Sequence, residues 1–207
     1  MTEEEWLASS DPRPMQALLR DKTSDRKVRL FAVGCCRQVW SVLKDERSRN
    51  AVVVAERYAD GLTTQKELAR VRSEASAVVF GTFSIAIFDY LILAVIASGK
   101  RVVLGQLMKI PGVDPPPMNA RLSRIALLRD IFPNPFRPVV ADPAWLTPTV
   151  RSIASAIYAD RAFDRLPILA DALEEAGCTN ADILLHCRQP GEHVRGCWVV
   201  DLALGKV

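Results

Sequence analysis

Apolar residues recur three and four positions apart along most of this chain of 207 residues, and this period most constrains its fold. From Ser24 onward, for example, the apolar stripe comprises Val28, Phe31, Ala32, Cys35, Val39, Val42 and Leu43. No segment of useful length alternates strictly between apolar and polar residues, as a half-buried strand would. The pattern therefore predicts an all-α fold.

Residues that start and stop helices flank the same segments. Ser24 and Thr147 precede helical patterns in the manner of N-caps, and Pro148 then occupies the first helical position. A further helical pattern begins at about Asp45 and ends at Gly61. Glycine readily adopts the left-handed backbone conformation that often ends an α-helix. These signals predict helices that are separated by short turns.

A proline-rich segment divides the chain. Four prolines fall between Pro111 and Pro117 in the stretch MKIPGVDPPPMN. Proline cannot continue a helix interior, so a run of this kind forms a stiff connection. We expect an N-terminal helical unit over residues 1–105, a linker over 106–118 and a C-terminal helical unit over 119–207. The predicted architecture is a helical bundle or two packed helical units with this Pro-rich connection.

The stretch ASAVVFGTFSIAIFDYLILAVIASG, residues 75–99, carries Asp89 as its only charge. It is long enough to span a bilayer as a helix, and Lys100 and Arg101 follow it as flanking charges. An aspartate near the centre is costly in lipid, however, and a helix that is apolar all round also suits the buried centre of a bundle. We favour a buried helix, with an oligomer interface and a membrane span as the alternatives.

Charge and cysteine content argue against several classes of protein. The 27 basic and 24 acidic residues leave a net charge of +3, which is too balanced for the concentrated basic face of a nucleic-acid-binding protein. The five cysteines are Cys35, Cys36, Cys178, Cys187 and Cys197. Their odd number, and an opening MTEEEW in place of a secretory signal, predict a cytoplasmic protein with free thiols.

Both histidines lie in LLHCRQPGEHVRGCWVVDLALG, residues 184–205. His186, Cys187, His193 and Cys197 are all competent zinc ligands. We expect the last two to lie one turn apart on a helix that begins at about His193. Adjacent residues on a helix point about 100° apart, so one ion would take only one of His186 and Cys187.

A metal shell in this stretch would need a further ligand such as Cys178 or Cys35, and no CxxC or HxxxH frame is present. Glycine-rich phosphate loops, nucleophile elbows and paired carboxylate frames are also lacking. We therefore expect Pro190–Gly191 to form a turn between two helices and Cys197 to be a core residue. No catalytic residue, cofactor or metal ligand is predicted.

Several motifs of the chain closely resemble those of a large family of small bacterial proteins, in the same order. In this chain they read MTEEEWL, SDRKVRLFAVGCCRQVW, LLRDIFPNPFRPV and HVRGCWVVDLALGK. The family carries forms of MTEAEWL, RKLRLFACACCRR, LLRDIFGNPFRP and HVRGCWVVDLLLGK. The resemblance is weakest over residues 75–120, and it implies no catalytic residues because the family has no established activity.

The lack of a catalytic frame and the apolar surplus in residues 75–99 favour a non-enzymatic protein-interaction module. Such a module would be an adaptor, a regulator or a structural subunit, and it would bind a protein partner or form a homo-oligomer. The alternatives are a membrane-anchored form of the same module through residues 75–99 and a cysteine- or metal-dependent enzyme. Nucleic acid is not expected as a partner.

Overall fold

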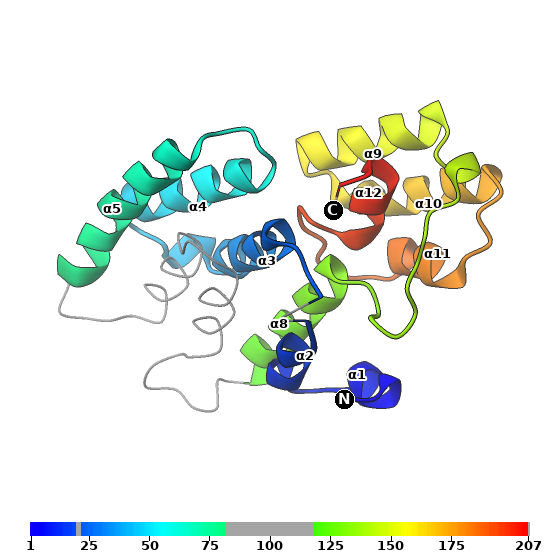
Figure 1. Cartoon of the computed structure of the whole chain (residues 1–207), viewed down its shortest axis with the longest axis horizontal. Coiled ribbons are helices and arrows are strands. Elements are labelled where there is room, and N and C mark those ends of the chain that lie inside the picture. Colours follow the sequence, from blue (N-terminus) through cyan, green and yellow to red (C-terminus); the bar gives the residue numbers. More distant parts are fainter. Residues whose placement is uncertain (20–21, 82–117, 207) are drawn as a thin grey trace. The chain divides into compact units, whose positions relative to one another are not determined.

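The structure is a computed structural model that describes residues 1–19, 22–81 and 118–206. All regular structure within these residues is helical and none of it is strand, which confirms the predicted all-α class (Figure 1). The chain divides into two compact units, residues 1–125 and 126–207.

The expected linker, residues 106–118, lies outside the described residues except for its last member, Met118. This residue begins α8 (Met118–Ile131), the helix within which the first compact unit ends and the second begins. The helix that we expected to open the C-terminal unit at residue 119 is α8, but up to Ile125 it belongs to the first compact unit.

The N-terminal unit is built from helices in succession. They are α1 (Glu3–Ala8), α2 (Pro12–Leu19), α3 (Asp25–Gln38), the short 3₁₀ helix Trp40–Val42, α4 (Glu46–Ala59) and α5 (Gln65–Gly81). Helix α4 packs against both α3 and α5 (Figure 1). Leu68, Val71 and Ala75 are buried among those residues of α5 whose side chains the structure describes.

The core of this unit surrounds α3. Phe31 and Cys35 are buried, as the apolar stripe predicts, but Leu30, Val33 and Cys36 are buried as well. These three residues lie off the predicted stripe, so α3 is buried on more sides than one apolar face would require.

Several predicted helix ends are confirmed. The side chain of Ser24 accepts a hydrogen bond from the amide of Lys27 at 3.3 Å, and Thr147 accepts one from Val150 at 3.3 Å. Each bond satisfies an amide that has no partner within its own helix. Gly61, just beyond α4, has a φ of +69°, a conformation that glycine adopts without a steric penalty.

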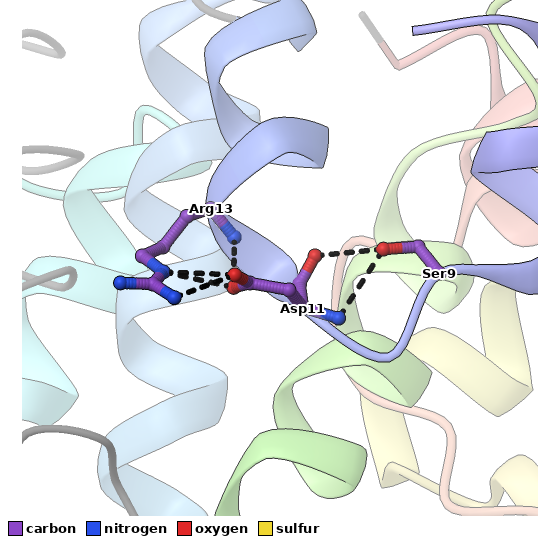
Figure 2. A network of polar contacts seen from close by, with 3 residues as sticks. All are labelled: Ser9, Asp11 and Arg13. Carbon is purple, nitrogen blue, oxygen red and sulfur yellow. Dashed lines mark hydrogen bonds and ion pairs between the residues drawn. The ribbon is translucent and has the colours of Figure 1, made fainter.

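A side-chain network that the sequence patterns did not reveal starts α2 (Figure 2). The Ser9 hydroxyl accepts from the amide of Asp11 at 3.2 Å and donates to the carbonyl of the same residue at 2.8 Å. The Asp11 carboxylate accepts from the amide of Arg13 at 3.0 Å and also pairs with its guanidinium. Asp11 thus satisfies a first-turn amide and places negative charge at the helix N-terminus, where it is favourable.

The C-terminal unit contains the end of α8, the short 3₁₀ helices Pro143–Trp145 and Phe163–Arg165, and four further α-helices. These are α9 (Pro148–Asp160), α10 (Leu166–Glu175), α11 (Ala181–Arg188) and α12 (Trp198–Leu204). Within the unit α9 packs against α10 and α12, and α10 packs against α11 (Figure 1). Their inward faces form one apolar core.

The last helix begins later than predicted. We expected it to start at about His193, but α12 starts at Trp198 and the preceding residues form a turn. In this turn the amide of Val194 donates to a side chain, that of Asp130, and Gly196 has a φ of +98°. This glycine conformation is incompatible with a continuous right-handed helix, so His193 does not lie on the face of α12.

The apolar segment of residues 75–99 is described only in part. Its first seven residues complete α5, and residues 82–99 lie outside the described residues. The three alternatives for this segment, a buried helix, an oligomer interface and a membrane span, concern mainly residues 82–99, so they stay predictions. Of the helices in the described ranges, none combines the length and the apolarity needed to cross a membrane.

Candidate functional site

The carboxylate of Asp130, in the last turn of α8, is the centre of a buried polar cluster in the C-terminal unit. Its residue is only 3% exposed. One carboxylate oxygen lies 2.6 Å from Nδ1 of His193 and 3.3 Å from Nε2 of His186. The other oxygen accepts from the amide of Val194 at 2.9 Å. Three donors therefore surround a carboxylate whose burial would otherwise be unfavourable.

His186, in the last turn of α11, connects Asp130 to a thiol. Its Nε2 lies 3.3 Å from Sγ of Cys197, and its Nδ1 lies 3.3 Å from the side-chain nitrogen of Gln189. Because an amide nitrogen can only donate, Nδ1 is the acceptor and the ring proton lies on Nε2, facing Asp130. The ring also packs against Trp198, with centroids 5.1 Å apart.

The ionisation of Asp130 follows from these contacts. Burial acts to raise the pKa of Asp130, but the hydrogen bonds from His186 and His193 outweigh it. The net pKa of Asp130 is therefore below its usual value, and the carboxylate is charged at neutral pH.

The ring of His193 has one nitrogen with a partner and one without. Nδ1 donates to the ionised Asp130, which can only accept, so in the neutral ring Nε2 carries the lone pair. Nε2 is buried and has no hydrogen-bond partner among the described residues. A buried polar atom in this state is uncommon in folded proteins and unfavourable by about 1–3 kcal/mol.

The structure brings together three of the four zinc-competent residues expected from the sequence. His186, His193 and Cys197, with Asp130, each offer one ligand atom, and these atoms all lie within 4.8 Å of one another. Cys187 is not a member of this group, as its position beside His186 on a helix predicted. The suggested supplementary ligands Cys178 and Cys35 are not members either.

Sequence reasoning missed Asp130, which precedes His193 by 63 positions. One local signal could have found it: Asp130 is the one acidic residue of α8 and lies in its last turn, where a carboxylate is unfavourable. A carboxylate in that position needs a compensating partner, and the two histidines supply it.

A small cavity of about 260 Å³ adjoins the cluster within the C-terminal unit. Cys187 and His193 line it together with Phe163 and Pro190. Its volume is slightly below the range of about 300–1,000 Å³ that is usual for pockets of drug-sized ligands.

All five thiols are free and buried. Burial raises the pKa of Cys35 and of Cys187 to about 12, and it raises the pKa of Cys36 and Cys197 well above the ordinary value. Only the thiolate is a good nucleophile, so these four cysteines are unreactive at neutral pH.

We expect the native protein to react slowly with a chromogenic aromatic disulfide at about pH 8. A thiol of pKa about 12 is ionised in only ~1 of 10⁴ molecules at that pH, and burial also blocks the reagent. The absorbance of the released thiol would measure this directly. All five cysteines should react once the chain is denatured. A native cysteine that reacts within seconds would contradict the prediction.

A second feature of this unit is the outer face of the α10–α11 pair. Ile168 on α10 is 55% exposed and Leu185 on α11 is 66% exposed. One turn after each lie Asp171 and Arg188, and the Arg188 guanidinium bridges to Asp171 at 2.8 Å and also to Glu174. We call these five residues the α10–α11 face.

Comparison of the chain with protein-family models, curated proteins and solved structures gave no match. The resemblance to a family of small bacterial proteins therefore stays a prediction, and functional proposals for this chain depend on the geometry described above.

Proposed function

We propose that this chain is a non-enzymatic helical module of the cytoplasm that acts through protein contacts, first of all with a second copy of itself. The observation that carries this proposal is the α10–α11 face. It combines two large aliphatic side chains, Ile168 and Leu185, that are more than half exposed on helices whose other faces are packed.

The charges on this face suit self-association. A two-fold interface uses the same patch on both copies, so the patch must be complementary to itself. Arg188 lies beside Asp171 and Glu174 on one surface, and both signs of charge are therefore present. In a pair of copies, Arg188 of each can contact the carboxylates of the other while the aliphatic side chains meet between them.

The chemistry of the buried groups supports a non-enzymatic role. Cys187 and Cys197 hold their protons because their pKa values are raised by burial, and both histidines are engaged by Asp130. Five unpaired cysteines also suit the reducing environment of the cytoplasm. A structural subunit or an adaptor fits these properties.

Sedimentation velocity tests the proposal. We expect the wild-type chain to dimerise at concentrations up to about 100 µM, and we expect Leu185→Glu to weaken the dimer at least ~10-fold, because a carboxylate then replaces a central apolar contact. Leu62→Glu is the matched control, since Leu62 is similarly exposed but lies in the N-terminal unit. A monomeric wild-type protein, or a dimer that is indifferent to Leu185→Glu, would contradict this role for the α10–α11 face.

A further inference from the structure

We propose that Asp130, His186, His193 and Cys197 bind one Zn²⁺ ion, which ties the end of α8, the end of α11 and the turn before α12 together. This site was not expected from the sequence, where no metal ligand was predicted. It is independent of the proposed self-association, because all four side chains are at most 7% exposed and lie within one unit.

The spacing of the ligand atoms suits one ion. Zinc binds nitrogen and oxygen at about 2.0–2.2 Å and sulfur at about 2.3 Å, so neighbouring ligand atoms of a tetrahedral site lie about 3.3–3.8 Å apart. Nε2 of His186 is 3.3 Å from Sγ of Cys197 and 3.3 Å from the Asp130 carboxylate. The full set lies within 4.8 Å, so adjustments of about 1 Å would close it around an ion.

The nitrogen of His193 that faces the cluster is Nδ1, which lies 2.6 Å from the Asp130 oxygen that also faces His186. This contact is shorter than the spacing between two ligand atoms of one zinc ion, so binding would replace the hydrogen bond. The two atoms would move about 1 Å apart and each would bind the ion. Nε2, on the far side of the ring, would then carry the ring proton.

The donor set also balances charge and selects the metal. Binding would displace the thiol proton of Cys197 to solvent and move the ring proton of His186 from Nε2 to Nδ1, where the Gln189 amide can accept it once its oxygen is turned toward the ring. The carboxylate of Asp130 and the thiolate of Cys197 then carry two negative charges, which the divalent cation neutralises while both imidazoles stay neutral. A neutral site avoids the large penalty of a net buried charge. Two imidazoles, one thiolate and one carboxylate favour zinc over the hard cations Mg²⁺ and Ca²⁺, which prefer oxygen ligands.

Four protein ligands complete a tetrahedral shell and leave no open position, which is the arrangement of structural zinc sites. His186 and His193 are at most 7% exposed in their side chains, and Asp130 and Cys197 are buried more deeply. The site therefore serves to stabilise the C-terminal unit.

Cobalt spectroscopy of the full chain tests the site. The protein would be stripped with a chelator and titrated with Co²⁺, a spectroscopic probe for zinc sites. We expect saturation at one equivalent, intense visible bands of a tetrahedral ion and a thiolate-to-cobalt charge-transfer band. Zn²⁺ should then displace the cobalt and raise the melting temperature of the stripped protein by about 4 °C or more.

Two cysteine variants identify the sulfur ligand. Cys197→Ser should lose the charge-transfer band, whereas Cys187→Ser, which changes a buried thiol outside the cluster, should keep it. His186→Gln should weaken metal binding at least ~10-fold. Circular dichroism of each variant confirms its fold, and the wild-type spectrum remains decisive if a variant fails to fold.

Three results would overturn the proposal. They are wild-type protein that binds well below one equivalent of Co²⁺ or Zn²⁺, a weak octahedral spectrum without a charge-transfer band, and a charge-transfer band that persists in Cys197→Ser. Sedimentation of the stripped protein is a separate measurement, so the failure of the metal site and the failure of self-association are distinguishable.

Discussion

Asp130→Ala is expected to destabilise the C-terminal unit by about 3–5 kcal/mol, because it leaves a cluster of buried donors without their shared acceptor. The side chains of His186 and His193 and the amide of Val194 all contact this carboxylate in a region that excludes water. Urea unfolding of the wild type and the variant would measure the loss. A chelator present throughout separates the effect of the hydrogen bonds from that of any bound ion.

Asp182→Ala is the matched control for this prediction. Asp182 lies in the first turn of α11 and contacts Arg137 at 3.8 Å with both side chains well exposed. Exposed ion pairs contribute at most about 1 kcal/mol, so this variant should unfold near the wild-type midpoint. Comparable losses for the two variants would show that Asp130 is not the centre of a buried network.

Leu30→Ala is expected to destabilise the N-terminal unit by about 2–5 kcal/mol. Leu30 lies on α3 with 0% of its surface exposed, and truncation removes buried apolar contacts and leaves a cavity. Leu62→Ala removes the same atoms from a residue that is 62% exposed, and its effect should stay within about 0.5 kcal/mol.

Urea unfolding followed by far-ultraviolet circular dichroism would compare the two leucine variants. Two transitions should be fitted if the units unfold separately. Equal losses for Leu30→Ala and Leu62→Ala would mean that α3 is not the centre of its unit.

Helix α3 shows which buried residues the apolar period can predict and which it cannot. Val28, Phe31 and Cys35 are buried as the stripe predicts, and the N-cap at Ser24 is confirmed. The burial of Leu30 lies beyond such reasoning, because a stripe describes one face of one helix. Whether other segments cover the remaining faces depends on residues far along the chain.

The residues of the buried cluster were likewise predictable from the sequence only in part. His186, His193 and Cys197 are recognisable as metal-competent residues within one short stretch, and the exclusion of Cys187 follows from helix geometry. Asp130 enters only because α8 brings a carboxylate from a distant position to the turn before α12. Sequence spacing within residues 184–205 holds no information about that approach.

The sequence by itself determined the local properties of this protein: its helical class, the starts of α3 and α9, both ends of α4, and the free state of its thiols. These properties depend on interactions between residues a few positions apart, which caps and periodicity record. Only the tertiary structure decided that α12 begins after Gly196 and that Asp130 joins the two histidines and Cys197. Both outcomes arise from one non-local contact, in which the buried Asp130 carboxylate takes the amide of Val194 as a donor.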